Sequence, residues 1–216
     1  MRIRGGRINL ELHELAKRSG PSVLLLHALF GASDDWGEAP GAWPGSVYAL
    51  DFAGHGNSEW VAGGAYAPEA LAADADAALQ QIGSCALVGA GVGAYVALLL
   101  AGARRDAVPA ALILPGPGLG GGGAWPDFSR PPSRIEVALP DEPSVRRYDP
   151  MVRMLAFDMR PIDYTQQFAA AARRLLLVED GAPRPPWWEE ARRVPAAHAF
   201  EAEVPAALAR LAAAVA

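Results

Sequence analysis

Short apolar runs alternate along the chain with longer segments in which apolar residues recur at helical spacing. Residues 22–27 (SVLLLH) and 47–52 (VYALDF) are nearly continuous apolar runs, which is typical of strands buried on both faces of a parallel sheet. Residues 7–15 alternate apolar and polar side chains instead, as expected for a strand with one exposed face. Further strands are predicted at residues 85–90, 110–114 and 174–178, with an ambiguous extended segment at 196–202.

Helices are predicted between these strands because apolar residues recur every three or four positions. The predicted helices cover residues 68–82, 92–104, 144–159, 164–174, 187–193 and 204–216. Strands that alternate with helices indicate an α/β fold, with a mostly parallel central sheet and helices on both faces. The chain has no internal repeat and no linker, so residues 1–216 are expected to form a single domain.

The composition fits one globular domain and excludes several function classes. Of the 216 residues 51% are hydrophobic, which is enough for a substantial core, and the net charge of −5 comes without a basic stripe for nucleic acid. The apolar run at Leu98–Leu100 is too short to span a membrane, and residues 1–6 lack the apolar core of a signal peptide. The single cysteine, Cys85, excludes an intrachain disulfide and is expected to be buried and inert. We therefore expect a cytoplasmic protein. Its basic residues are arginine except Lys17, a usage that indicates a GC-rich bacterial genome.

Three short motifs follow predicted strands: LLLHALFG (24–31), DFAGHGNS (51–58) and GAGVG (89–93). In order and spacing they resemble the H-G-x-x-G, D-x-x-G-H-G-x-S and G-x-S-x-G motifs of the α/β-hydrolase family, with Ala28 replacing one glycine. The resemblance covers roughly the first half of the chain and implies the α/β-hydrolase fold. It also implies a cap inserted before the strand at 174–178. This interval, residues 115–173, is shorter than most caps, so we expect a reduced lid.

The resemblance implies a nucleophilic serine at position 91, where this chain has Gly91. Ala90 and Val92 are inert, and Tyr95 lies one helical turn further on, so no neighbour supplies a nucleophile. The nucleophile in this family is typically strained, at a cost of roughly 1–3 kcal/mol for a residue other than glycine. Glycine adopts positive φ without this penalty. Gly91 therefore indicates a degenerate catalytic triad.

The two other triad members are also in doubt. The family's acid follows the strand represented by residues 174–178, where the expected place falls on Ala182 or Pro183; nearby Asp180 is either a candidate acid or a solvated turn residue. His198 is either the family's base, because the segment after it resembles the stretch before the last helix, or a residue of the last strand. We favour the second interpretation of His198, because almost no room remains for a strand before it.

A binding pocket remains a further expectation from the resemblance. The amides of Leu29 and Val92 occupy the places of the oxyanion-hole donors, with His27 and Phe30 beside them, so a small apolar or carbonyl-containing ligand is the expected partner. Alternatively, bulky side chains fill this space. His27 and His55 match positions that are structural in the family. The sequence has no metal-ligand cluster, phosphate loop or other cofactor motif. Six further apolar residues either belong to a lid or pocket or merely cover the sheet edge: Trp125, Phe128, Tyr148, Met151, Met154 and Phe157.

Three hypotheses for function follow. The leading one is an α/β-hydrolase-fold protein without serine hydrolase activity that retains at most a ligand site over Gly91. The second is an unorthodox hydrolase or lyase in which His198, with Asp180, activates water or abstracts a proton; it requires His198 within about 5 Å of the Gly91 turn. The third is an interaction module that uses an exposed Trp187–Trp188 pair and the Gly/Pro loop that follows residue 114, although we favour a buried contact of these tryptophans between their helix and the sheet.

Overall fold

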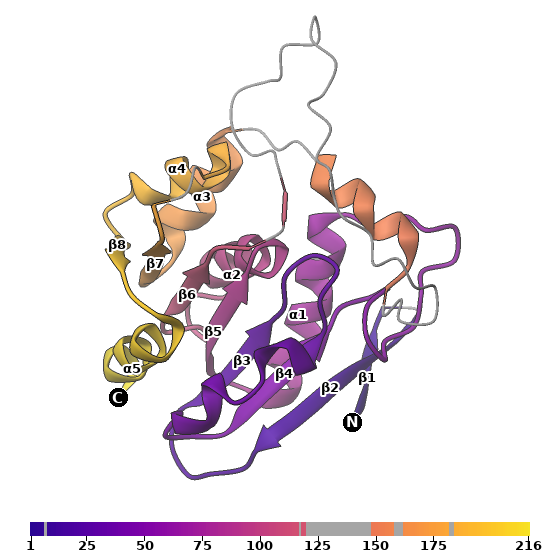
Figure 1. The fold of residues 1–216 in the computed structure, drawn as a ribbon, viewed down its shortest axis with the longest axis horizontal. Helices are drawn as coiled ribbons and strands as arrows, with labels where there is room; N and C mark the ends of the chain where they lie inside the picture. Colours follow the sequence, from indigo (N-terminus) through magenta and orange to yellow (C-terminus); the bar gives the residue numbers. More distant parts are fainter. Residues whose placement is uncertain (7, 117, 120–147, 158–161, 182–183) are drawn as a thin grey trace, which may run out of the picture.

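The protein is built around one eight-stranded sheet with strand order β1-β2-β4-β3-β5-β6-β7-β8 (Figure 1). The computed structural model describes residues 1–6, 8–116, 118–119, 148–157, 162–181 and 184–216. Strands β3 to β8 are parallel where they pair, and β1 and β2 are antiparallel additions at one edge. The strands are β1 (Arg2–Gly5), β2 (Ile8–Ala16), β3 (Ser22–Leu26), β4 (Val47–Asp51), β5 (Cys85–Ala90), β6 (Ala111–Leu114), β7 (Leu175–Glu179) and β8 (Ala197–Glu201).

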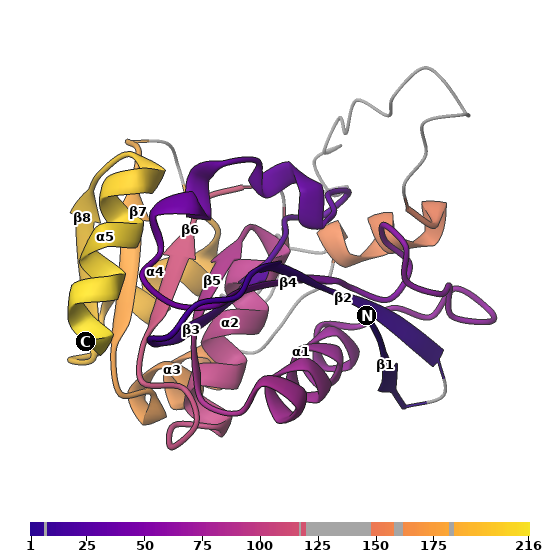
Figure 2. The same ribbon diagram turned by 90° about the horizontal axis from the view of Figure 1, so that it is seen from below.

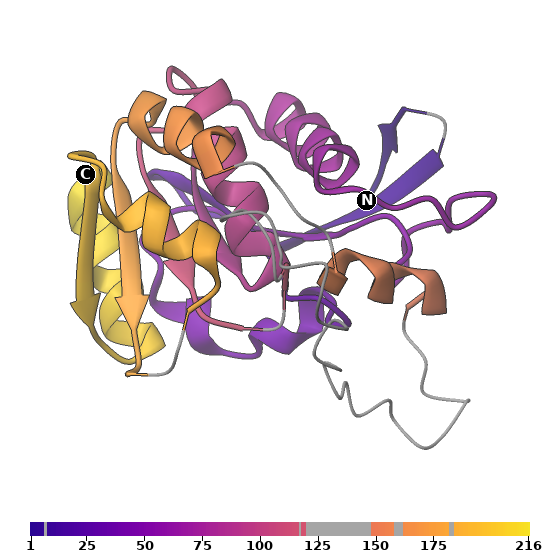
Figure 3. The same ribbon diagram turned by 90° about the horizontal axis from the view of Figure 1, so that it is seen from above.

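Helices cover both faces of the sheet, as the alternation of strands and helices predicts. Four helices lie on one face and the C-terminal helix lies on the other (Figures 2 and 3). Successive residues of β3 supply both layers: Leu24 and Leu26 pack with the four helices, and Val23 and Leu25 with the fifth. The α-helices are α1 (Pro68–Ile82), α2 (Val92–Ala103), α3 (Ile162–Ala171) and α4 (Pro186–Arg192) on the first face, and α5 (Val204–Val215) on the second.

Two elements differ from the sequence predictions. Strand β1 was not predicted, because two of its four residues are arginines. It forms a strand because it pairs with β2. The helix predicted over 144–159 is a 3₁₀ helix, η4 (Pro150–Phe157), in its described part. The Asp149 carbonyl accepts the Val152 amide, an i→i+3 bond, and the Asp149 carboxylate caps the segment by accepting the Met151 amide. Residues 134–139, whose sequence is also strand-like, lie outside the described residues.

Cys85 lies in the central strand β5 and is buried, as expected from its neighbours. Burial raises the pKa of its thiol to about 12, which keeps the thiol protonated and unreactive. None of the described helices combines the length and the apolar character that crossing a bilayer requires.

The Trp187–Trp188 pair does not form an exposed surface, so the interaction hypothesis is wrong for these residues. Their exposed fractions are 2% and 1%, and the two rings pack edge to face, 5.6 Å apart. Trp187 also packs against Tyr95 of α2, and its indole Nε1 donates a hydrogen bond of 3.3 Å to the Leu119 carbonyl. The pair therefore fixes α4 to α2 and to the loop after β6.

Candidate functional site

The turn between β5 and α2 has the backbone geometry of a nucleophile elbow. Gly91 has φ 54° and ψ −115°, a region that only glycine occupies without strain, and α2 begins at the next residue. The Gly91 amide donates to the Leu114 carbonyl, and the Gly91 carbonyl accepts the amides of Ala94 and Tyr95. The sharp turn is thus retained, and the position at its tip has no side chain.

The flanking glycines of the GAGVG motif, Gly89 and Gly93, are required for a separate, structural reason. A Cβ atom on Gly89 would lie 2.1 Å from the Gly93 carbonyl oxygen, and one on Gly93 would lie 2.1 Å from the Leu26 oxygen. These contacts are with backbone atoms of α2 and β3, which have no freedom to give way. The spacing of the motif therefore reflects the close approach of helix and sheet as well as the elbow.

The loop after β6 lies against the elbow. A Cβ atom on Gly118 would be 2.6 Å from both the Gly91 carbonyl carbon and the Val92 nitrogen, and one on Gly116 would be 3.2 Å from the Gly91 nitrogen. Gly91 and Val92 are buried. Gly116 and Gly118 therefore have a specific role in the fold, since their lack of side chains allows the described part of this loop to pack on the elbow.

The loop after β3 is held by His27. It carries Leu29, whose amide is expected, like that of Val92, in the place of an oxyanion-hole donor. His27 is buried; its Nδ1 donates to the Ala28 carbonyl at 2.8 Å and its Nε2 accepts the Phe52 amide at 3.2 Å, which is the structural use expected of it. Leu29 is buried, and no described residue accepts a hydrogen bond from its amide or from that of Val92. Phe30 has φ 69° and is the single non-glycine residue with positive φ in the described chain.

Of the predicted lid residues, Tyr148 lies closest to this loop. Its ring is 5.0 Å from that of Phe30, and its backbone forms an isolated antiparallel bridge with His55. Met151 and Met154 are exposed on η4. The side chains of Trp125, Phe128 and Phe157 are outside the described part of the structure, and the reduced cap at 115–173 stays a prediction.

His198 does not approach the elbow. It is the second residue of β8, where it pairs with Leu176, and the chain of partners continues through Leu112 to Val88 of β5, three strands away. At the usual strand spacing this separation is about 14 Å, well beyond the reach of a general base. His198 is therefore an exposed strand residue, in agreement with the favoured interpretation. Only Ala202 and Glu203 separate β8 from α5, so the connection that holds the family's histidine is two residues long here.

Asp180 follows β7 directly, at the carboxyl edge of the sheet, but it serves a local ion pair. Its carboxylate binds the Arg184 guanidinium at 2.5 Å, four residues on, and its side chain is half exposed. Strand β7 is two positions from β5, about 10 Å at normal spacing. The structure therefore brings together Gly91, Val92 and the loop of His27, Leu29 and Phe30, and leaves Asp180 and His198 apart from them.

A model of the alpha/beta hydrolase family matches residues 23–215, which is most of the chain. The chain belongs to this family. Among curated proteins, none matches the sequence.

Several solved structures share the fold of this alpha/beta hydrolase at low sequence identity. The thioesterase domain from the curacin biosynthetic pathway is 18% identical with a TM-score of 0.75, over 100% of this chain and 97% of that one. The hypothetical protein PA1622 from Pseudomonas aeruginosa PAO1 is 21% identical with a TM-score of 0.69, over 99% and 96%. The bottromycin epimerase BotH, solved with bottromycin A2, is 19% identical with a TM-score of 0.64, over 100% and 99%.

The D-x-x-G-H-G-x-S turn of this alpha/beta hydrolase is fixed by two buried carboxylates, one of which sequence reasoning missed. Asp74 of α1 accepts the Ala53 amide at 3.0 Å, and burial raises the pKa of Asp74 to about 7. His55 donates from Nδ1 to the Ala53 carbonyl, and no described residue binds its buried Nε2. Burial, together with the neighbouring His27, lowers the pKa of His55 to about 3, so this histidine is neutral. A polar residue on the apolar face of the predicted 68–82 helix was the available signal for Asp74.

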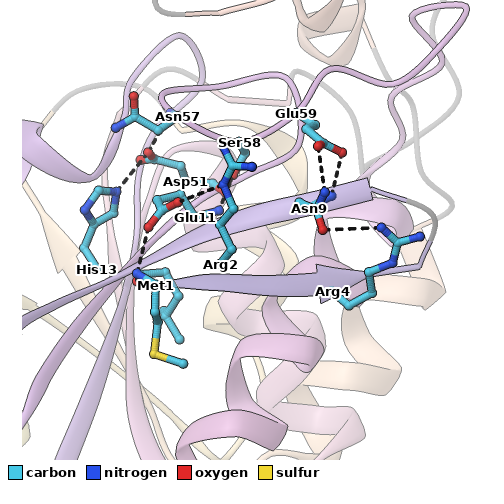
Figure 4. A network of polar contacts seen from close by, with 11 residues as sticks. Met1, Arg2, Arg4, Asn9, Glu11, His13, Asp51, Asn57, Ser58 and Glu59 are labelled. Atoms are coloured by element: carbon cyan, nitrogen blue, oxygen red, sulfur yellow. Dashed lines mark hydrogen bonds and ion pairs between the residues drawn. The ribbon is translucent and has the colours of Figure 1, made fainter.

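The second carboxylate, Asp51, ends β4 and is 1% exposed. It accepts the amides of Ser33 at 2.7 Å and Asn57 at 2.9 Å, and its Oδ2 lies 3.1 Å from Nε2 of His13 (Figure 4). Burial alone would raise the pKa of Asp51, but these hydrogen bonds outweigh it and lower the pKa. His13 is on the polar side of the strand predicted at 7–15, where an exposed side chain is expected; it is instead partly covered and contacts this carboxylate.

Asp74 makes stability depend on pH. Because its folded-state pKa is above its usual value, the folded protein holds a proton that the unfolded chain has released, and stability falls as pH rises from about 4 to about 7. Asp74→Asn keeps an acceptor for the Ala53 amide without the buried charge. It should raise the free energy of unfolding at pH 8 by about 1–3 kcal/mol and have little effect at pH 4.

Urea unfolding of both proteins at the two pH values measures this effect. The matched control is Asp76→Asn on the same helix, which removes a charge paired with Arg104 and should not stabilise at pH 8. If the free energies of unfolding of the two variants changed equally with pH, the buried charge of Asp74 would not be the cause of the pH dependence.

In the described part of the chain, no three His, Cys, Asp or Glu side chains gather into a group that could hold a metal ion.

Proposed function

We propose that this alpha/beta hydrolase does not cleave its ligand through a serine nucleophile, and that the elbow serves as a binding and structural turn. The observation that carries the proposal is the elbow itself. Gly91 keeps the strained φ and ψ values in which a nucleophile would be presented, yet it offers no atom beyond the backbone.

The positions of the candidate base and acid support the same proposal. A nucleophile needs a base within hydrogen-bond reach, and the base needs an orienting partner. His198 lies about 14 Å away in β8, and Asp180 is bound to Arg184. The hypothesis of an unorthodox enzyme built on His198 therefore lacks the proximity that it requires.

The likeness to BotH bears on what the family fold can do in place of hydrolysis. That protein is named an epimerase and was solved with bottromycin A2, so the name of at least one protein with this fold is not that of a hydrolase. The amides of Leu29 and Val92 are the groups through which this chain would hold a carbonyl or carboxylate oxygen. A ligand that reached Val92 would have to displace Gly118, which lies against the same nitrogen.

Turnover of 4-nitrophenyl acetate and butyrate tests the proposal. We expect rates no higher than buffer alone, and no labelling by a fluorophosphonate. Gly91→Ser should also be inactive, because among the described residues neither His198 nor Asp180 is within reach of the new hydroxyl, and should lose about 1–3 kcal/mol of stability from its positive φ. The matched control is Ala90→Ser, which adds the same hydroxyl one residue earlier at a strand position and should cost far less.

Two results would contradict the proposal: ester turnover by the unmodified protein well above background, or a large activity gained by Gly91→Ser alone. The binding part is tested separately by adding butyrate or butyramide while the backbone amides of Leu29 and Val92 are followed by NMR. We expect shifts at these two amides and none along α5, and shifts at neither amide would remove the pocket from the proposal.

A further inference from the structure

The sheet ends in an open edge at β8. This strand is the last in the sheet order, pairs with β7 alone and lies outermost at the end of the sheet away from β1 (Figures 2 and 3). Along the strand His198, Ala199 and Glu201 are exposed, and Ala197 and Phe200 are half-buried. No described element of the chain therefore covers this edge.

The hydrogen bonds between β7 and β8 fix which backbone groups point outward. The Ala196 carbonyl accepts the Leu175 amide at 2.9 Å, and the register between the two strands is unbroken from there to Glu201. In a parallel pair, alternate residues of a strand bond to its neighbour, so the even-numbered residues of β8 are turned toward β7. The N–H and C=O groups of Ala199 and Glu201 point away from the sheet and are available to another strand.

The two edges of the sheet differ in their protection against such pairing. Strand β1, at the opposite edge, has four residues and carries two exposed arginines, Arg2 and Arg4. Short length and charged side chains are devices that prevent strand addition at an edge. The sequence of β8, AHAFE, has no proline, lysine or arginine, and no bulge interrupts its pairing with β7. Strand β8 is therefore the edge suited to receive another strand.

The charges at the two ends of β8 favour a second copy that runs antiparallel to the first. Glu201 lies beside Glu179 of β7, whose carboxylate is paired with Arg192, and no described cation pairs with Glu201. Arg193 precedes the other end of β8, and its side chain is 67% exposed. When Ala199 of one copy lies opposite Ala199 of the other, each Glu201 lies opposite the other copy's Ala197 and approaches its Arg193. A parallel pair would instead place like charges together.

Helix α5 widens the contact beyond the strand. The Arg210 guanidinium lies 4.1 Å from the centre of the Phe200 ring, so this side of α5 borders β8. Ala206 and Ala213 lie one turn to either side of Arg210, and both are exposed. A two-fold axis through the strand pair keeps both α5 helices on one face of the joined sheet. Their small side chains then allow the close approach that brings the interface toward the roughly 800 Å² per partner of a specific contact.

We propose that β8 is the contact of a two-fold dimer, in which the β8 strands of two copies pair antiparallel about Ala199 and join their sheets into one. A two-fold contact uses the same surface on both copies and is closed, and the arginines of β1 protect the other edge, so assembly stops at two. The proposal is independent of what the elbow does, because β8 is three strands from β5.

Sedimentation velocity at protein concentrations of about 1–200 µM tests the dimer, and we expect a Kd below about 100 µM with no larger species. Ala199→Pro should raise this Kd at least about 10-fold with little change in the thermal midpoint, because it removes an N–H that makes no bond to β7. The matched control is Ala199→Val, which keeps the N–H at the same position and should stay within about 3-fold of the unmodified protein. If Ala199→Pro does not fold, Ala199→Lys replaces it, since two lysines would face each other at the axis.

A charge exchange tests the antiparallel orientation. Glu201→Arg and Arg193→Glu should each weaken self-association about 3-fold or more, because each variant alone places like charges opposite one another. An equimolar mixture of the two variants should associate more tightly than either alone, because both pairs of the mixed dimer are then of opposite charge. A monomer at all concentrations would overturn the proposal, as would a dimer unaffected by both Ala199→Pro and Ala199→Lys, or a mixture that associates no better than its components.

Discussion

Replacing Gly93 by alanine should destabilise the protein by at least about 3 kcal/mol, although alanine in a helix is normally better than glycine by about 1 kcal/mol. The added methyl group would lie 2.1 Å from the Leu26 carbonyl oxygen and 2.6 Å from that of His27. Both atoms belong to the backbone at the end of β3, so relief requires α2 to move away from the sheet, which uncovers buried surface along its length.

The change is measured as the midpoint and free energy of urea unfolding. Gly41→Ala is the matched control, since Gly41 lies in the short 3₁₀ helix η2 (Ala39–Ala42) and a Cβ atom there meets nothing within 4 Å. We expect the control to be close to neutral. Nearly equal stabilities of the two variants would mean that α2 and β3 are further apart in the protein than in the structure described above.

Replacing Asp51 by alanine should cost about 3–5 kcal/mol. The change leaves the amides of Ser33 and Asn57 without their acceptor, and an unpaired buried donor costs about 1–3 kcal/mol. The pH dependence leads to the same conclusion, because the pKa of Asp51 is lower in the folded protein than in the unfolded chain. The stability that the Asp51 carboxylate contributes is therefore present above about pH 4 and is lost as pH falls through its lower folded-state pKa.

His13→Ala separates the carboxylate from its partner. The His13 side chain is 29% exposed, so its removal should cost no more than about 1 kcal/mol. Thermal and urea unfolding of both variants at pH 7 give the comparison. Losses of similar size would indicate that the contact with His13, and not the hydrogen bonds from the backbone amides, makes Asp51 important.

The fold was predictable because its signals are local. Continuous apolar runs such as residues 22–26 and 85–90 correspond to buried parallel strands, and the glycine spacing at 89–93 identified the turn between β5 and α2. Periodicity also placed α1, α2 and α5 within one or two residues of their observed ends. Strand β1 depends on its hairpin pairing with β2, and the 3₁₀ form of η4 depends on a side-chain cap, so the apolar pattern alone did not indicate them.

The candidate site was predictable only in part. The motifs located Gly91, Val92 and the His27 loop, because these follow strands whose carboxyl ends meet. The ambiguity at His198 was resolved by its pairing with Leu176, which no spacing in the sequence encodes. The contact of His13 with Asp51 joins residues 38 positions apart across an antiparallel pair, so it required the register of β2 against β4.

The chain is fastened on both sides of residues 120–147. On one side Leu119 accepts the Trp187 indole, and on the other the Asp149 amide donates to Gly54 at 2.7 Å while its carboxylate accepts the Tyr66 hydroxyl. The described ends of this interval are thus tied to two separate parts of the molecule, α4 on one side and the turn after β4 on the other, so loss of either hydrogen bond would free only one of them.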